Sequence, residues 1–248
     1  MKNLIAYNNK LESIIKDISK NNIPFGMDID DVILKFKNYF RNGINEHFNL
    51  NLNQEDIVNY NVNTILPIKD KGFTRKDVYA MLRKIGNRAE FTKLSTNEGV
   101  NEIIDLLITY HDNNYDNFFI ITSRSEQLYD DFKNKTLENL RFNKIKFHEY
   151  NVIFDKEKEY VAKALELKLF FEDNLETALK IIKKNIPIIM PSHEWNKKTP
   201  KDTTLLSLDD VKYKHELINE IESYSGKYFF RINNFKELLE YSNDILKR

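Results

Sequence analysis

Short apolar runs alternate with helix-like segments along the second half of the sequence, and this alternation restricts the possible folds most strongly. The runs "YNVIF", "KLFFED", "IPIIM" and "YFFRI" have the length of strands, and the segments between them have the length and periodicity of helices. Strands that alternate with helices in this way form a parallel sheet with helices on both faces. The sequence therefore predicts an α/β fold of three layers with a Rossmann-like core.

The first half contains two more predicted strands, with a long helical insertion between them. The first strand ends in the acidic run "PFGMDIDD", and the second, "NFFIITSR", breaks at Thr122 and Ser123. In the second half, "KEKEYVAKALEL" and "LETALKIIKK" are predicted as helices that connect strands. The remaining helices are predicted over residues 4–18, 31–48, 74–86, 97–111, 126–140 and 208–224 and from residue 233 onward.

The composition excludes several kinds of site. The 248 residues include 38 Lys+Arg and 38 Asp+Glu, so the zero net charge gives no electrostatic argument for binding nucleic acid or an anionic membrane. The chain has no cysteine, which excludes disulfides, zinc–thiolate sites and a cysteine nucleophile. The start, "MKNLIAYNNKLESIIKDISK", lacks the unbroken apolar stretch of a signal peptide, and no later segment has the length of a membrane span. We therefore expect a cytoplasmic protein.

Polar side chains follow three of the predicted strands, in "GMDIDD", "FIITSR" and "LFFEDN". In an open parallel sheet, ligands bind outside the carboxyl ends of the strands. The helix predicted at "KEKEYVAKALEL" begins at the same edge with Lys156 and Lys158. The residues expected around one cavity are Asp28, Asp30, Thr122, one lysine, Glu172 and Asp173.

Each of these clusters alone has a plainer explanation. Charged residues make up 31% of the chain, so an Asp-x-Asp pair is more often a turn or a helix cap than a site. The segment "EDN" is a good helix start with Asn174 as the capping residue, and a single lysine is usually a solvated helix residue. The ordered combination, with each cluster directly after an apolar strand, favours a site.

This ordered set resembles the haloacid dehalogenase (HAD) superfamily of phosphohydrolases over nearly the whole chain. The segments "DIDDVILKF", "TSR", "FFEDN" and "PSHEWN" look most like its 5′-nucleotidase branch, of the deoxyribonucleotidase type. The resemblance implies a core of residues 1–35 and 95–248 and a helical cap of residues 36–94, of the kind called a C1 cap. Two positions depart from the usual pattern: Asp31 stands where Gly is common, and Glu172 stands where many members have Asp.

The resemblance implies an Mg²⁺-dependent phosphomonoesterase that acts through an aspartyl-phosphate. Asp28 would be the nucleophile, and Asp30 would protonate the leaving group and then take a proton from the attacking water. Thr122 would hold a phosphoryl oxygen, and a lysine would neutralise developing charge. Lys158 is preferred for that lysine by its distance from "FFED", with Lys156 and Lys163 as alternatives.

Magnesium suits a site made only of oxygen ligands. The predicted ligands are a carboxylate oxygen of Asp28, the backbone carbonyl of Asp30 and Asp173, completed by substrate and water. Glu172, Ser123 and Arg124 are predicted to support the site from beside these groups.

The expected substrate is a small phosphate ester, with a nucleoside monophosphate favoured. Phe36 lies two helical turns beyond Asp28, so its ring is a candidate for stacking on a base; aromatic residues at this spacing are more often core. Tyr39 and Phe40 are predicted to be structural, Trp195 to pack at the rim of the cleft, and His193 to be a loop residue.

Other functions stay open at this level. Asp-x-Asp after a strand also occurs in metal-dependent nucleotide-sugar glycosyltransferases, but that role would leave Thr122, Lys158 and Asp173 without a function. Within phosphatases, a polynucleotide 3′-phosphatase is an alternative, which the neutral charge disfavours. A non-catalytic nucleotide-binding relative would also keep these residues. The sequence leaves the base, the sugar, the physiological substrate and the oligomeric state undetermined.

Overall fold

The computed structural model describes residues 8–108, 115–126 and 129–247. Its centre is a sheet of six strands in the order β3-β2-β1-β4-β5-β6, and every neighbouring pair is parallel. The strands are β1 (Phe25–Met27), β2 (Phe118–Thr122), β3 (Val152–Phe154), β4 (Phe170–Phe171), β5 (Ile188–Pro191) and β6 (Phe229–Ile232). The strand order reverses between β1 and β4, which are neighbours in the middle of the sheet.

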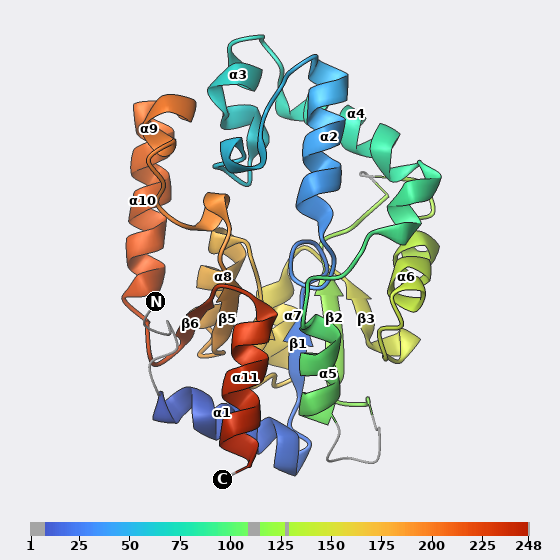
Figure 1. Cartoon of the computed structure of the whole chain (residues 1–248), viewed down its shortest axis with the longest axis vertical. Coiled ribbons are helices and arrows are strands. Elements are labelled where there is room, and N and C mark those ends of the chain that lie inside the picture. The colour runs from blue at the N-terminus through green and yellow to red at the C-terminus, as the bar shows by residue number, and fades with distance from the viewer. Residues whose placement is uncertain (1–7, 109–114, 127–128, 248) are drawn as a thin grey trace.

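Helices cover both faces of this sheet, as Figure 1 shows for α5 and α11 in front of it and α7 and α8 behind it. The helices are α1 (Asn9–Asn21), α2 (Phe36–Phe48), α3 (Leu66–Lys69), α4 (Arg75–Gly86), α5 (Val100–Ile108), α6 (Phe132–Phe142), α7 (Lys158–Ala164), α8 (Leu175–Ile182), α9 (Asp202–Leu205), α10 (Leu208–Glu222) and α11 (Phe235–Leu246). The sheet with helices on both faces confirms the predicted three-layer α/β fold.

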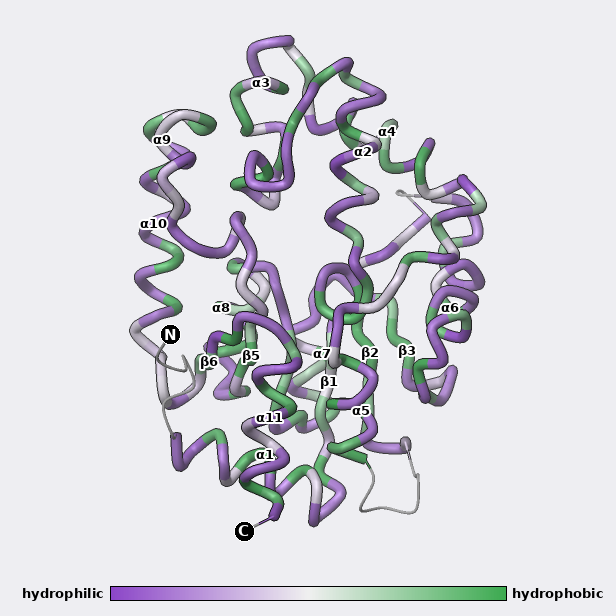
Figure 2. The backbone as a smooth tube through the Cα atoms, viewed as in Figure 1, coloured by the Kyte–Doolittle hydropathy of each residue, from purple (hydrophilic) through white to green (hydrophobic). Residues whose placement is uncertain are grey.

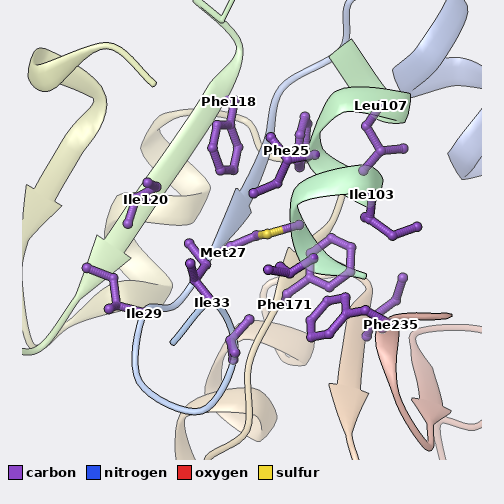
Figure 3. Close-up of a cluster of buried hydrophobic side chains, with 14 of the residues drawn as sticks. Phe25, Met27, Ile29, Ile33, Ile103, Leu107, Phe118, Ile120, Phe171 and Phe235 are labelled. Carbon is purple, nitrogen blue, oxygen red and sulfur yellow. The ribbon is translucent and has the colours of Figure 1, made fainter. Parts of the chain in front are cut away.

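Alternating side chains of the strands build a separate apolar cluster on each face. Ile120 on β2 and Phe171 on β4 pack with α1, α5 and α11, and Figure 3 shows this cluster around Met27. Their neighbours Ile121 and Phe170 point to the other face and pack with α7, α8 and α10. This alternation is the two-residue period of an extended strand, and it requires apolar residues at consecutive positions because both faces are covered.

Gly26 in β1 is the point of closest approach between β1 and the layer behind it. A Cβ atom added there would lie 2.8 Å from Leu167 Cδ1 and 2.8 Å from Phe170 Cδ2, closer than carbon atoms can approach. A glycine is therefore required for β1 to pack beside β4, and this contact sets the position of the chain at Asp28, two residues later.

Two predicted helices begin later than the sequence indicated. The helix expected from residue 31 begins at Phe36, because Asp31 has φ 57° and residues 31–34 form a turn instead. The helix expected from residue 126 begins at Phe132, after Asp131 at φ 52°. Both aspartates adopt the left-handed conformation, which a regular helix cannot continue through. The helical spacing of the apolar residues around them does not reveal this conformation.

The other predicted elements are present with shifts at their ends. The helix predicted over residues 74–86 forms as α4 and ends at Gly86. The first helix begins at Asn9, and the one predicted over residues 97–111 is described as α5 up to Ile108; residues 4–7 and 109–111 lie outside the described residues. The short helices α3 and α9 were not predicted.

The insertion between β1 and β2 contains α2, α3 and α4, and they lie together at one end of the molecule in Figure 1. We call residues 36–94 the cap; their assignment as a separate domain stays a prediction. The hydropathy colouring in Figure 2 shows mostly hydrophilic loops in the cap and hydrophobic stretches in the strands. The cap has an apolar cluster of its own, which includes Ile44 and Met81 and is completed by Trp195 and Leu206 from the chain after β5.

Among the described residues, no helix is both long enough and apolar enough to span a membrane.

Candidate active site

Asp28 is the first residue after β1, and its carboxylate is nearly enclosed by protein. Its backbone N–H donates to the carbonyl of Phe171, 2.9 Å away, so the pairing of β1 with β4 continues up to this residue. Lys158 at the start of α7 places its Nζ 2.8 Å from Asp28 Oδ1. Both side chains are less than a tenth exposed, so this is a buried ion pair at the carboxyl edge of the sheet.

Lys158 also contacts Glu172, which follows β4. Its Nζ lies 2.9 Å from Glu172 Oε2, so one ammonium group joins the carboxylates that follow β1 and β4. The other carboxylate oxygen, Oε1, accepts the backbone N–H groups of Asp173 at 3.1 Å and Asn174 at 3.0 Å. Glu172 lies two residues after Phe170, so its side chain points to the same face of the sheet, where α7 packs.

Asp173 is buried beside this pair, and only one of its two carboxylate oxygens has a hydrogen-bond partner among the described residues. Its Oδ2 accepts a hydrogen bond from Trp195 Nε1 at 3.0 Å, and its carbonyl accepts one from Asn196 Nδ2 at 3.0 Å. Its Oδ1 is buried and has no hydrogen-bond partner among the described residues. A buried carboxylate oxygen without a donor is costly, so this atom is available to a water molecule or a cation.

The acidic group fits a divalent cation. Oxygen atoms of Asp28, Glu172 and Asp173 lie within 4.8 Å of one another. Both oxygens of Glu172 already accept hydrogen bonds, so Asp28 and the unpartnered Oδ1 of Asp173 are the better ligands. Hard oxygen donors of this kind suit Mg²⁺. The side chain of Asp30 lies outside this group, and only its backbone carbonyl was predicted as a ligand.

The electrostatics of the site reflect crowded negative charge. Burial raises the pKa of Asp28 to about 7; Lys158 opposes this shift, and Glu172 and Asp30 add to it. Burial and the charge of Glu172 also raise the pKa of Asp173 well above its ordinary value. Burial alone would lower the pKa of Lys158, but Asp28 and Glu172 outweigh it and raise that pKa, so Lys158 stays protonated.

The structure distinguishes the three candidate lysines by position. Lys158 is buried in the acidic group, whereas Lys156 and Lys163 are exposed. Lys156 lines the cavity described below but is not in the ion pair with Asp28. Lys158 is therefore the lysine that the geometry favours for neutralising charge at Asp28.

Asp30 contacts a different cation. Arg124 donates from Nε to Asp30 Oδ2 at 3.0 Å and from Nη2 to Asp30 Oδ1 at 2.5 Å, in a two-point ion pair. Asp28 and Asp30 thus contact different cations, although they are only two residues apart. The long sequence separation between Asp30 and Arg124 explains why the pair was not foreseen.

Thr122 ends β2, Ser123 follows it, and both line the same cavity as Asp28. Thr122 is buried, and its Oγ1 accepts the backbone N–H of Arg124 at 3.4 Å. Its hydroxyl therefore retains its own proton for donation, which is the capacity that a phosphoryl oxygen would use.

Asp31 turns the chain sharply after Asp30. Its φ of 57° is a conformation that glycine adopts freely and that a short polar residue tolerates when it bonds locally. Its Oδ1 accepts the backbone N–H of Lys37 at 2.8 Å, and His193 Nε2 lies 3.1 Å from its carbonyl oxygen. These contacts explain how an aspartate occupies a position where glycine was the expected residue.

Burial lowers the pKa of His193 to about 4, which keeps its ring neutral.

A cavity of about 490 Å³ lies between the strand ends and the cap. Asp28, Asp30, Thr122 and Lys158 line it from the core. The aromatic residues that line it, mostly from the cap, are Phe36, Phe40, Tyr60, Tyr79, Phe91, Tyr129, Trp195 and Tyr213. The carboxylates of the lining thus come from the core and most of the rings come from the cap, which is suited to a ligand with a metal-bound anionic end and an apolar end.

Phe36 begins α2 and is partly buried in this wall. Its ring stacks on Phe40 at 5.4 Å between centroids and meets the edge of Phe91 at 6.3 Å. The structure therefore places Phe36 both in the cavity wall and in packing contact with other rings. Tyr39 does not line the cavity and instead donates from its hydroxyl to the carbonyl of Ile85 at 2.7 Å.

Tyr60 is a cavity residue that the sequence did not indicate. Its side chain is 51% exposed because it faces the cavity. The enclosed surroundings and the carboxylates of Asp173, Asp28 and Asp30 raise its pKa well above the ordinary value. The phenol therefore stays protonated and presents a hydrogen-bond donor from the cap. It lies in the Asn-rich passage "NYNVN", where no spacing distinguishes it from a surface residue.

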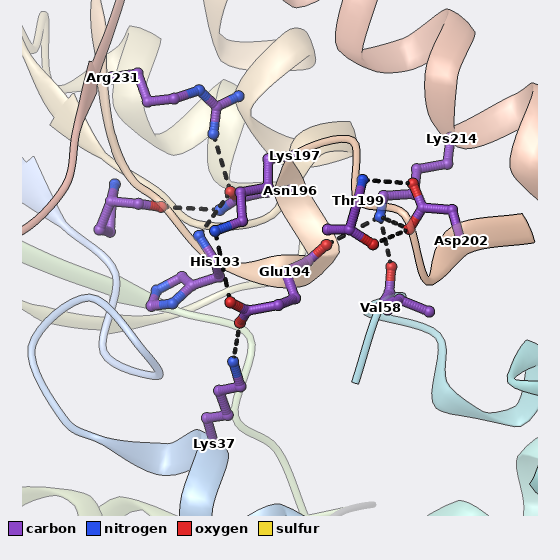
Figure 4. Close-up of polar contacts among 11 residues, drawn as sticks. Lys37, Val58, His193, Glu194, Asn196, Lys197, Thr199, Asp202, Lys214 and Arg231 are labelled. Carbon is purple, nitrogen blue, oxygen red and sulfur yellow. Dashed lines mark hydrogen bonds and ion pairs between the residues drawn. The ribbon is translucent and has the colours of Figure 1, made fainter. Parts of the chain in front are cut away.

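The chain after β5 joins the cap to the site. Figure 4 shows Lys37 of α2 paired with Glu194, and Lys214 of α10 directed at the cap residue Val58. Lys214 Nζ donates to Val58 O at 2.8 Å, to Glu194 O at 2.9 Å and to Asp202 Oδ1 at 2.7 Å. The segment that positions Asp173 through Trp195 is therefore also bonded to the cap, and Trp195 is itself a mostly buried residue in the lining of the cavity.

No family model and no curated protein matches the sequence. Solved structures do match. A HAD hydrolase of Entamoeba histolytica superposes with a TM-score of 0.53 at 14% identity, over 91% of this chain and 100% of the other. A HAD family hydrolase of Deinococcus radiodurans R1, solved with bound phosphate and sodium, gives 0.51 at 12% identity, over 90% and 95%. A haloacid dehalogenase-like hydrolase of Streptococcus pneumoniae gives 0.52 at 9% identity, over 89% and 99%. The chain has the HAD fold.

Proposed function

We propose that the protein is a phosphomonoesterase of the HAD type in which Asp28 forms an aspartyl-phosphate. The observation that carries this proposal is the buried carboxylate of Asp28, paired with Lys158 at 2.8 Å and placed beside the unpartnered oxygen of Asp173. The fold shared with HAD hydrolases supports the reaction class, since this fold brings the carboxyl ends of β1, β2 and β4 to one edge.

The side chains divide the reaction between them. A carboxylate oxygen of Asp28 forms the bond to phosphorus while the bond from phosphorus to the ester oxygen breaks. The proton for the departing oxygen comes from Asp30, which later accepts a proton from the water that hydrolyses the aspartyl-phosphate. Lys158 stabilises the charge at Asp28, and the hydroxyl of Thr122 donates to a phosphoryl oxygen.

Asp28 and Asp173 would hold Mg²⁺, together with the backbone carbonyl of Asp30. When bound there, the ion would supply positive charge that offsets the repulsion between a phosphate dianion and the surrounding carboxylates.

We expect activity to depend on Mg²⁺. Exhaustive treatment with EDTA should abolish phosphatase activity, and added Mg²⁺ should restore it, because the site holds more carboxylates than cationic side chains. Binding should also be detectable without turnover, as a rise in the melting temperature of the wild-type protein with Mg²⁺. Asp173→Asn should require more Mg²⁺ for both effects. Full activity after EDTA treatment would exclude the metal site.

The proposed substrate is a nucleoside monophosphate. The cavity of about 490 Å³ is within the size range of sites for small organic ligands, and its cap side is rich in aromatic rings. A base could stack on Phe36 while the phosphate reaches Asp28, since both residues line one cavity. The assay that tests the function is a panel of nucleoside monophosphates, sugar phosphates and p-nitrophenyl phosphate, with and without Mg²⁺. Absence of hydrolysis across the whole panel would refute it.

Phe36→Ala should reduce selection among nucleotides far more than it reduces hydrolysis of p-nitrophenyl phosphate. A lost base–aromatic stack costs about 1–3 kcal/mol, which is roughly one to two orders of magnitude in kcat/KM. Thr122→Ala should instead impair all substrates alike, because they share the phosphate. Tyr39→Phe is the control for cap packing, since Tyr39 does not line the cavity and its hydroxyl donates to the backbone carbonyl of Ile85. Equal losses on all substrates for Phe36→Ala would identify Phe36 as a packing residue.

A further inference from the structure

Arg124 is a buried cation that holds the carboxylate of Asp30 at two points. Its side chain is 1% exposed, and its guanidinium holds both oxygens of Asp30 at 3.0 Å and 2.5 Å. A planar fork that binds a carboxylate at two points fixes both its distance and its orientation, which a lysine cannot do.

The guanidinium is itself held from two other directions. Its Nη1 donates to Thr136 Oγ1 on α6 at 3.1 Å, and that hydroxyl in turn donates to the carbonyl of Phe132 at 2.7 Å. The ring of Phe91, in the segment that leads from the cap back to the core, lies 5.0 Å from the guanidinium carbon. Arg124 is therefore held by the core and by the end of the cap, and cannot easily follow a movement of Asp30.

Asp30 keeps access to the cavity while it is held. Its side chain is 25% exposed and lines the cavity together with Asp28, so a carboxylate oxygen can meet the ester oxygen of a bound substrate while the guanidinium contacts it from behind. A proton-transfer group must lie within hydrogen-bond distance of its target, and small misplacements are costly in rate.

We infer that Arg124 is a positioning residue that orients Asp30 for proton transfer to the leaving group. The inference rests on the proposed function. In this role Arg124 acts through Asp30 and keeps its own protons throughout, since a guanidinium does not give them up in proteins. The bonds change elsewhere: Asp28 bonds phosphorus as the ester bond breaks, the proton carried by Asp30 moves to the ester oxygen, and Asp30 regains a proton from the water that hydrolyses the aspartyl-phosphate.

Two substrates of similar size separate positioning from a general loss of structure. The p-nitrophenolate leaving group departs without a proton, whereas the more basic phenolate of phenyl phosphate benefits from one. Because kcat/KM reports only the steps up to departure of the leaving group, the later use of Asp30 as a base does not enter the comparison.

Arg124→Met should therefore lower kcat/KM for phenyl phosphate about tenfold to a hundredfold more than for p-nitrophenyl phosphate. Arg124→Lys keeps the charge but loses the planar two-point contact with Asp30, and should show the same selective loss. Thr136→Val removes only the hydroxyl behind the guanidinium, and should show a smaller loss in the same direction. This last variant and Arg124→Lys carry the test if Arg124→Met does not fold.

The outcomes are distinct. Selective loss on phenyl phosphate supports positioning of Asp30. Equal loss on both substrates, no loss on either, or full rescue by Arg124→Lys would overturn the inference while leaving the proposed function standing. A folded wild-type enzyme that hydrolyses neither ester with Mg²⁺ would overturn the proposed function, and this inference with it.

Discussion

Asp28→Asn should lower kcat on the order of 10⁴-fold or more while the protein stays folded. An amide has nearly the shape of a carboxylate but is a poor nucleophile toward phosphorus. Lys158 keeps its ion pair with Glu172 at 2.9 Å in this variant, so the buried ammonium is not left alone. The measurement is steady-state hydrolysis of p-nitrophenyl phosphate with Mg²⁺, together with thermal unfolding of the same preparations.

Asp31→Asn is the matched control, because it makes the same change from a carboxyl group to an amide three residues along the chain. An asparagine tolerates the positive φ of this position, and its Oδ1 can still accept the backbone N–H of Lys37. We expect its kcat to remain within a few-fold of the wild type. An Asp28→Asn enzyme that is as active as this control would rule out a covalent step at Asp28.

Lys158→Met should lower the free energy of unfolding by about 3–5 kcal/mol, because it leaves two buried carboxylates without their shared partner. Asp28 and Glu172 would then face each other across a site with little access to water. Activity should fall as well, since the charge at Asp28 is no longer stabilised. Unfolding in urea without Mg²⁺ measures the stability, and hydrolysis with Mg²⁺ measures the activity.

Lys156→Met provides the comparison for the loss of a lysine from the same loop. Lys156 is exposed, and substitutions at exposed positions usually change stability by less than about 0.5 kcal/mol. If Lys158→Met proves as stable as Lys156→Met, the ion pairs of Lys158 contribute no net stability, and its role in holding the acidic group must be abandoned.

The meeting of Asp28, Lys158, Glu172 and Asp173 could be expected from the sequence, because all of them follow or adjoin apolar runs of a parallel sheet. The carboxyl ends of such strands lie at one edge, whatever the details of packing. Their chemical roles stay predictions. The departure at Glu172 now has a structural explanation, since its longer side chain reaches Lys158 and also accepts two backbone N–H groups.

The contacts that orient the site could not be read from local patterns. The pairing of Asp30 with Arg124, and of Asp173 with Trp195, joins segments far apart in the chain, and sequence spacing carries no information on such pairs. Helical spacing also hid the turn at Asp31, because apolar residues continue through it. Tyr60 shows the same limit for the cap, where the polar Asn-rich passage gave no sign of a residue facing the cavity.

The central claim is the covalent bond between Asp28 and phosphorus, and chemical trapping tests it most directly. An Asp30→Asn enzyme should accumulate the aspartyl-phosphate, because it lacks the base that activates water. The enzyme is quenched in acid during turnover of radiolabelled p-nitrophenyl phosphate, whose leaving group departs without a proton, and is then digested and mapped by mass spectrometry. The account predicts label on Asp28 that hydroxylamine releases. The label should be absent from the double variant that carries both Asp30→Asn and Asp28→Asn. Turnover with no label on the protein, or with label on another residue, would contradict it.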